Sequence, residues 1–337
     1  MTRIPITRAS TLLGYVHVLR AIGAPVDAAL RRVKLPTLLD ECPDAWISFE
    51  RMQRFVADAA TREGIPDLGV RAKPPSLDRA MTRSFLDGLF SAPTLYRALQ
   101  CLPGITKRHT THVGTWIASR GDQVQFCVSM PLPPGTDGHT VTEVRTLLLM
   151  EQVVAGYAGP DFVPTRRLVS SRRDELNFDL EAAHGGVPVA TAQPYGAIEF
   201  PASLLRMPRL SSPPRHSQAD CTPDTVAETL TACLEPYLLD GCPSIHDAAS
   251  LFGFSVRTLQ RELAVEGLTY RRLVDKLRHL KALAVLRDGP TDLTDLALRL
   301  GYSDETAFSR AFRRWAGFPP SAYQTDAGKP DVSAANS

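Results

Sequence analysis

The chain has 337 residues, of which 44% are hydrophobic and 22% are charged, and its formal net charge is +2. This length predicts two domains, and the ordinary globular composition allows each of them to bury a core. A net charge so close to zero excludes a general attraction for nucleic acid, so any such function must depend on a local arrangement of charges.

Cysteine spacing and apolar runs indicate the compartment. No C-x-x-C pair occurs, which argues against a zinc ribbon or a thioredoxin-type motif. Residues 1–10 lack the long apolar stretch of a signal peptide, and no run approaches the roughly 18–20 apolar residues that span a bilayer. We therefore expect a cytoplasmic protein with reduced thiols and no membrane association.

Apolar residues three and four positions apart predict helices in the first part of the chain, at residues 11–22, 26–33, 48–61, 94–102 and 141–157. Alternating hydrophobicity predicts a β-hairpin from residues 112–118 and 123–130, joined by a turn-like Ser-Arg-Gly-Asp. Two short strands are predicted at residues 166–169 and 197–200. Helices mixed with a partly antiparallel sheet predict an α+β domain over residues 1–207.

A change of composition separates this domain from the rest of the chain. Residues 208–223, PRLSSPPRHSQADCTP, are rich in Pro and Ser and have no apolar period, which predicts a linker. Residues 224–324 are predicted to form an all-α domain, and residues 325–337 a disordered tail.

Two segments of the all-α domain resemble each other about 48 residues apart. They read SIHDAASLFGFSVRTLQREL from Ser244 and DLTDLALRLGYSDETAFSRAF from Asp292. Each keeps a small Ala where two helices can touch, a Gly that can adopt positive φ in the turn, and a Ser that can cap the next helix. The matched pairs are Ala249 with Ala297, Gly253 with Gly301, and Ser255 with Ser303. This pattern predicts two helix-turn-helix units.

The second helix of each unit, about residues 255–265 and 304–315, carries polar side chains of the types that contact DNA. Arg pairs with guanine, Gln with adenine, and Thr with a thymine methyl. The candidate DNA-binding residues are Arg257, Thr258, Gln260, Arg261, Thr306, Ser309, Arg310 and Arg313. Further arginines that can bind phosphates are Arg271, Arg272 and Arg314.

An amphipathic run at residues 270–287 lies between the two units. Its predicted apolar face carries Leu273, Leu277, Leu280, Ala284 and Leu286. As one helix of 18 residues it would span roughly 27 Å. With the helices at its ends, it could place the two recognition helices about 34 Å apart, which is one turn of B-DNA. A structural helical bundle is the alternative, since the domain holds twelve Lys and Arg against thirteen Asp and Glu. The duplicated pattern favours DNA binding to successive major grooves.

Residues 224–324 resemble the DNA-binding domain of the AraC/XylS family of transcription regulators. The stretch GYSDETAFSRAFRRWAGFPPSAYQ, residues 301–324, carries the resemblance. It implies a DNA operator, contact with RNA polymerase as an activator, and base reading by Arg257, Gln260, Arg261, Thr306 and Arg310. Glu305 departs from the neutral polar residue of many members, because an acid can accept from cytosine but repels phosphate.

Residues of about 10–207 resemble the arabinose-binding-type N-terminal domain of the AraC subgroup that contains the ornithine-utilisation regulator. The stretches ISFERMQRFVADAA, SAPTLYRALQCL and GAIEFPASLLRMP carry this resemblance, while DRAMTRSFLDGLF departs from it. The resemblance implies a domain that senses an effector, dimerises, or does both. From the residues themselves, Trp116, Phe126 and Val128 are either walls of a pocket or ordinary core, and the helix at residues 141–157 is either core or a dimer face.

Enzymatic readings have little support in the sequence. His109 and His112 could offer two metal ligands, but no facing acid or Cys stands at a fixed spacing. Cys101 near His109 could suggest a thiol nucleophile. No nucleophile elbow, dinucleotide-binding or phosphate-binding loop occurs. We expect no enzyme, no cofactor and no metal.

The sequence thus predicts a DNA-binding transcription regulator that responds to a small-molecule effector and can form a homodimer. One alternative is a DNA-binding regulator whose N-terminal domain only dimerises. The other is an enzyme or sensor with an appended DNA-binding domain.

Overall fold

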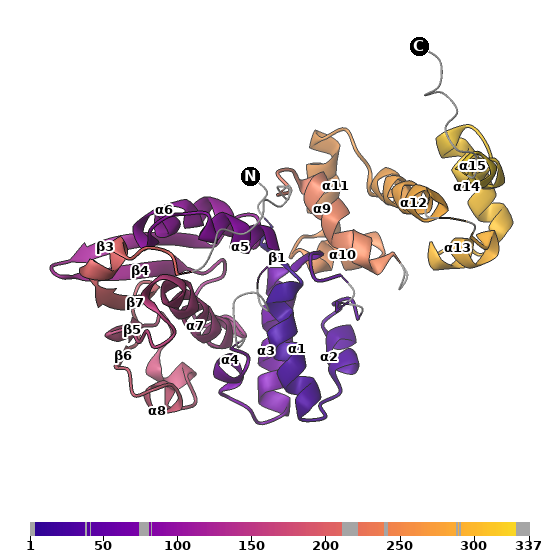
Figure 1. Cartoon of the computed structure of the whole chain (residues 1–337). Coiled ribbons are helices and arrows are strands. Elements are labelled where there is room, and N and C mark those ends of the chain that lie inside the picture. Colours follow the sequence, from indigo (N-terminus) through magenta and orange to yellow (C-terminus); the bar gives the residue numbers. More distant parts are fainter. Residues whose placement is uncertain are drawn as a thin grey trace, which may run out of the picture. The chain divides into compact units, whose positions relative to one another are not determined.

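The computed structural model describes residues 4–37, 39–40, 42–73, 81, 83–210, 222–238, 242–287, 289 and 291–327 (Figure 1). The chain forms two compact units, Thr2–Pro223 and Asp224–Ser337. Most of the predicted linker, residues 211–221, and most of the predicted tail, residues 328–337, lie outside the described residues. Pro208 and Arg209 belong to the first unit, where Pro208 forms a β-bridge with Thr94.

The first unit begins with a small helical layer. Helices α1 (Ser10–Ala21), α2 (Val26–Arg32) and α3 (Phe49–Arg62) pack around one apolar core. Two antiparallel strands, β1 (Ile6–Arg8) and β2 (Trp46–Ser48), border this core. The predicted helices at residues 11–22, 26–33 and 48–61 are confirmed, and Ser48 caps α3 by accepting from the Arg51 N–H.

A five-stranded sheet forms the second layer of this unit. Its order is β3-β4-β7-β5-β6, and only the β5–β6 pair is parallel. The strands are β3 (Gly114–Arg120), β4 (Gln123–Ser129), β5 (Arg166–Leu168), β6 (Val189–Ala190) and β7 (Gly196–Pro201). The predicted hairpin is confirmed as β3–β4, with Gly121 at positive φ in its turn.

Helices cover one face of this sheet (Figure 1). They are α5 (Arg83–Phe90), α6 (Leu95–Thr106) and α7 (His139–Ala158). The unit also contains the short helices α4 (Leu68–Arg71) and α8 (Leu180–Ala183). Val124, Phe126 and Val128 of β4 all face the helices. Four apolar residues of α7, Leu147, Leu148, Val154 and Tyr157, are 0% exposed within the unit. Their burial favours the core role over the dimer face for this side of the helix.

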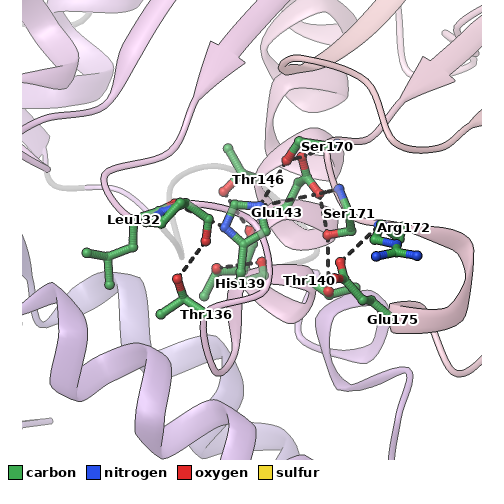
Figure 2. A network of polar contacts seen from close by, with 12 residues as sticks. Leu132, Thr136, His139, Thr140, Glu143, Thr146, Ser170, Ser171, Arg172 and Glu175 are labelled. Atoms are coloured by element: carbon green, nitrogen blue, oxygen red, sulfur yellow. Dashed lines mark hydrogen bonds and ion pairs between the residues drawn. The ribbon is translucent and has the colours of Figure 1, made fainter.

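A buried carboxylate fixes the N-terminal end of α7 to the loop after β5 (Figure 2). Glu143 is 0% exposed, and its two oxygens accept four hydrogen bonds. The donors are the backbone N–H and the hydroxyl of Ser170, at 2.7 and 2.5 Å, and those of Ser171, at 3.1 and 2.7 Å. His139 lies 2.9 Å from the Ser170 hydroxyl. Because every Glu143 lone pair has a donor, this charge is buried without an unmet partner.

Helices are the only regular secondary structure among the described residues of the second unit, so the predicted all-α fold is confirmed. Its helices are α9 (Val226–Leu234), α10 (Ile245–Leu251), α11 (Val256–Val265), α12 (Tyr270–Arg287), α13 (Leu293–Arg299), α14 (Glu305–Ala316) and α15 (Pro320–Ala327). Helix α15 continues three residues into the segment predicted to be disordered.

Helix α12 has the predicted bounds but a different buried stripe. Leu280 is 51% exposed and Ala284 is also exposed, although the sequence pattern placed both on the apolar face. The buried stripe runs through Leu273, Val274 and Leu277 and then shifts to Ala282 and Leu286. The shift has a physical reason, because the C-terminal half of α12 packs into the core of the second helix-turn-helix unit.

Candidate nucleic-acid interface and an apolar cavity

The first helix-turn-helix unit consists of α10 and α11. Gly253 has φ +68° in the turn, and the Phe254 N–H donates to the Ala249 carbonyl at 2.9 Å, which closes the end of α10. Ser255 begins the recognition helix by accepting from the Thr258 N–H at 3.1 Å. Ala249 is 1% exposed at the helix contact. The predicted roles of Ala249, Gly253 and Ser255 are confirmed.

The second unit, α13 and α14, repeats the backbone but not the cap. Gly301 has φ +78°, and the Tyr302 N–H donates to the Ala297 carbonyl at 2.9 Å. The prediction that Ser303 caps the recognition helix is wrong. The residue inserted in this copy, Asp304, is the N-cap and accepts from the Ala307 N–H at 2.7 Å, while Ser303 donates to Asp304. This bond to the Ala307 N–H holds the pKa of Asp304 below its usual range.

Helix α11 presents most of its predicted DNA-binding side chains to solvent. Arg257, Gln260 and Arg261 are exposed. The 3.3 Å ion pair between Arg261 and Glu262 leaves 70% of the Arg261 side chain exposed, and such surface pairs hold their partners weakly. Thr258 is half-buried, and its hydroxyl lies 2.9 Å from that of Ser255. Thr258 therefore also interacts with Ser255, the N-cap of α11, in addition to its predicted role in DNA binding.

Helix α14 presents Thr306, Arg310 and Arg313 to solvent, while Ser309 is half-buried. Glu305 lies in the first turn, and its Oε2 accepts from the Thr294 hydroxyl of α13 at 3.1 Å. This bond ties the acid that departs from the family pattern to the first helix of its own unit.

A groove of about 560 Å³ in the C-terminal domain is lined mainly by α12 and α14. Four arginines line it, namely Arg271, Arg278, Arg310 and Arg314. Asp275 is the one acid among its lining residues, and it pairs with Arg314 at 3.2 Å. Such a concave, basic surface attracts phosphates.

Sequence reasoning missed Arg278, although it had singled out Arg271, Arg310 and Arg314. The guanidinium carbon of Arg278 lies 5.0 Å from the ring centroid of Tyr302, next to the turn of the second unit. Its position within an amphipathic helix gave no signal that it would reach the same groove as α14. Arg272 and Arg313 are exposed but do not line the groove.

The N-terminal domain, Thr2–Pro223, contains an apolar cavity of about 100 Å³ between the β3–β4 face and helices α1, α6 and α7. Phe126 and Val128 line it, as predicted. Trp116 does not, because alternation along β3 places Thr115 on the cavity side and Trp116 on the other. Trp116 is 37% exposed and packs edge-on against Tyr195, with ring centroids 5.1 Å apart.

The residues considered for metal or thiol chemistry have separate surroundings. His109 is buried, with Nε2 3.0 Å from the Thr11 hydroxyl, whereas His112 interacts with the Thr111 hydroxyl. Cys101 is exposed. Across the described ranges, no three His, Cys, Asp or Glu side chains gather as metal ligands. None of the helices in those ranges has both the length and the apolar character needed to cross a bilayer.

Both domains of the chain resemble known protein families. The family described as the arabinose-binding domain of AraC transcription regulators, N-terminal, matches residues 23–209, and the helix-turn-helix domain family matches residues 248–326. The HTH-type transcriptional regulator VirS of Mycobacterium tuberculosis is 25% identical over 340 residues, which covers 95% of this chain and 97% of VirS.

A second relative is the ornithine utilization regulator of Pseudomonas aeruginosa. It is 31% identical over 150 residues, which covers 41% of this chain and 44% of the relative. Among solved structures, the transcriptional regulator CdpR from Pseudomonas aeruginosa aligns over 89% of this chain and 96% of its own, with 22% identity and a TM-score of 0.34.

Proposed function

The chain belongs to the AraC family of transcription regulators, and we propose that its helices α11 and α14 enter successive major grooves of one operator. It is a DNA-binding regulator with an N-terminal effector-binding domain. One observation supports the assignment of α11 and α14 to DNA major grooves, called the groove assignment below. Two helix-turn-helix units of matched geometry each present an exposed arginine at the same repeat position, Arg261 and Arg310.

A basic groove suited to phosphate binding supports the proposal. The groove beside α14 gathers Arg271, Arg278 and Arg310, which is a local basic surface in a domain with no excess of positive charge. Helix α12 joins the two units and spans roughly 27 Å at the rise of an α-helix. Affinity would therefore come from a few placed arginines and fall steeply with salt.

Replacing the two matched arginines tests the groove assignment. Genome-wide mapping of bound sites supplies an operator, and fluorescence anisotropy then compares wild type with Arg261→Ala and Arg310→Ala. We expect each variant to lose about 1–3 kcal/mol of specific binding and to relax preference at one base pair. The two base pairs should lie in different major grooves.

Arg299→Ala is the matched control, since Arg299 is an exposed arginine on the first helix of the second unit, 3.6 Å from Asp295. It should bind the operator like wild type. If Arg261→Ala and Arg310→Ala also bind like wild type with unchanged base preference, the two helices do not read the grooves.

Contact with RNA polymerase and formation of a homodimer are parts of the proposal that rest on the family alone. Light scattering of the purified chain measures the second of these. A regulator whose first domain only dimerises is the competing function, and it differs in having no ligand in the cavity of that domain. The cavity lined by Phe126 and Val128 favours an effector-responsive regulator.

A further inference from the structure

Arg145 is a buried cation at the wall of the apolar cavity. Its side chain is 2% exposed and lines the cavity together with Tyr15. Nε donates to the Ala72 carbonyl at 3.2 Å, and the guanidinium carbon lies 5.0 Å from the Tyr15 ring centroid. Nη2 is buried without a hydrogen-bond partner, and among the described residues no carboxylate lies within 4.0 Å of the guanidinium.

Arg167 shows how the same unit buries an arginine when it supplies the counter-ion itself. Arg167 is 1% exposed, and its Nε donates to Glu151 at 2.6 Å. Its Nη1 donates to the His184 carbonyl at 3.0 Å. A buried guanidinium stays charged and is costly without an anion, so the contrast between Arg167 and Arg145 points to an anion that the described residues do not supply.

The surroundings of Arg145 are shaped for the guanidinium. A Cβ on Gly14 would lie 3.2 Å from Nη2 and 2.8 Å from the Ala72 carbonyl, so the glycine leaves the space that the side chain occupies. Burial lowers the pKa of Arg145, and the neighbouring Tyr15 acts in the opposite direction. Burial also raises the pKa of Tyr15 to about 12, so this neighbour supplies no negative charge at neutral pH.

Two further polar atoms on the cavity wall lack partners. They are His109 Nδ1 and the Thr115 hydroxyl, both buried. Burial, reinforced by the positive charges of Arg8 and Arg145, lowers the pKa of His109 to about 3, so the ring is neutral at physiological pH. One cation with two neutral groups suits a monoanion, because a phosphate dianion would need more charge and more donors.

The rest of the cavity wall determines the size and polarity of the part of the ligand that is not the anion. It consists of aromatic and aliphatic side chains, four methionines and five threonines. The methionines are Met52, Met81, Met130 and Met150, and the threonines are Thr11, Thr106, Thr110, Thr142 and Thr146. Methionine adapts its shape to small apolar groups. A volume of about 100 Å³ is of the order of the cavity of ~150 Å³ that admits benzene in another protein.

We propose that this cavity binds a small monocarboxylate, with its carboxylate on Arg145 and its compact apolar body against Phe126 and Val128. The proposal rests on the effector-responsive part of the proposed function and names the chemical class of the effector. It requires no change in the groove assignment of α11 and α14.

The test uses the full chain and paired probes. Benzoate, phenylacetate and branched and straight monocarboxylates of four to nine carbons are compared with their uncharged amides by calorimetry and thermal shift. We expect at least one acid to bind at least tenfold more tightly than its own amide. Equal binding of acid and amide throughout the panel, or no binding of any acid, would overturn the proposal.

Variants locate the site. Arg145→Met keeps a long apolar side chain and should weaken the selected acid at least tenfold while leaving its amide unchanged. Thr115→Val, which is nearly isosteric and leaves the charge in place, should weaken the acid severalfold and serves if Arg145→Met does not fold. Trp116→Ala, on the opposite face of β3, is the control and should bind like wild type. Unchanged acid binding by the Arg145 or the Thr115 variant contradicts the assignment.

Operator binding separates this proposal from the proposed function. If Arg261→Ala and Arg310→Ala lose operator affinity but no acid binds, the cavity proposal alone fails. If an acid binds through Arg145 but the recognition-helix variants bind the operator like wild type, the groove assignment alone fails. An acid that binds and also changes operator affinity supports both.

Discussion

The two helix-turn-helix units share a backbone but stabilise it differently. Each has a glycine at positive φ and an N–H that closes the first helix, yet Ser255 caps one recognition helix and Asp304 the other. The first unit buries aliphatic Leu259 at the position where the second buries Phe308. A repeated sequence pattern therefore fixes the turn geometry more strictly than the side chains that support it.

Electrostatics also differ at the start of the two recognition helices. Helix α11 begins with Arg257 in its first turn, whereas α14 begins with Asp304 and Glu305. Acids suit a helix N-terminus but repel phosphates. We infer that the first unit contacts the DNA backbone more strongly at this end of its helix than the second unit does.

The largest expected effect concerns the two cores. Phe308 is 0% exposed and packs against Phe312 and Tyr302, with ring centroids 5.8 and 5.7 Å apart. Phe308→Ala should lower the local free energy of unfolding by about 3–5 kcal/mol, against about 2–5 kcal/mol for Leu259→Ala. Hydrogen exchange measures both, and each loss should remain in the helices of its own unit. Loss of protection in both units after either change would show that they do not behave as separate cores.

A smaller effect concerns the two serines of the repeat. Ser255→Ala removes a cap and should cost about 1 kcal/mol of unfolding free energy. Ser303→Ala should change it by less than about 0.5 kcal/mol, because Asp304 is the cap of α14. Thermal or denaturant unfolding of the matched pair measures the difference. Equal losses of unfolding free energy in the two variants would show that Ser303 caps α14 after all.

The smallest effect concerns Glu305. Glu305→Gln keeps an acceptor for the Thr294 hydroxyl but removes a negative charge that would face the phosphates of a bound operator in the proposed complex. Operator affinity should rise about twofold at low salt, and the gain should shrink as salt screens the charge. Titrations at two salt concentrations measure this. A loss of affinity would show instead that the carboxylate accepts from a base, as it can from cytosine.

Sequence patterns predicted those features that depend on neighbouring residues. The repeat predicted both glycine turns, and alternation predicted the β3–β4 hairpin. The cap of α14 was missed because Ser303 and Asp304 are adjacent and both can cap, so only the observed bond to the Ala307 N–H separates them. Helix α5 was also not predicted. The short strands β1 and β2 were missed because three residues show little alternation, although the equally short β5 was predicted within residues 166–169.

The cavity could not have been derived from the sequence. Its wall residues come from segments as far apart as Tyr15, His109 and Arg145, and no local pattern joins them. An arginine in a helix is usually exposed, so Arg145 gave no signal of burial. Trp116 was misplaced because apolar size, rather than its position in the alternation of β3, suggested a wall.

Burial of His109 has a consequence for the unfolding equilibrium. In the unfolded chain a histidine takes up a proton below about pH 6.5, whereas the folded ring stays neutral down to about pH 3. Between these values the unfolded state binds more protons, so the contribution of His109 is complete above pH 6.5 and declines as the pH falls. The decline is at most about 1.4 kcal/mol per pH unit. The enclosure that leaves Nδ1 without a partner thus makes unfolding of the first domain a proton-uptake reaction in mild acid.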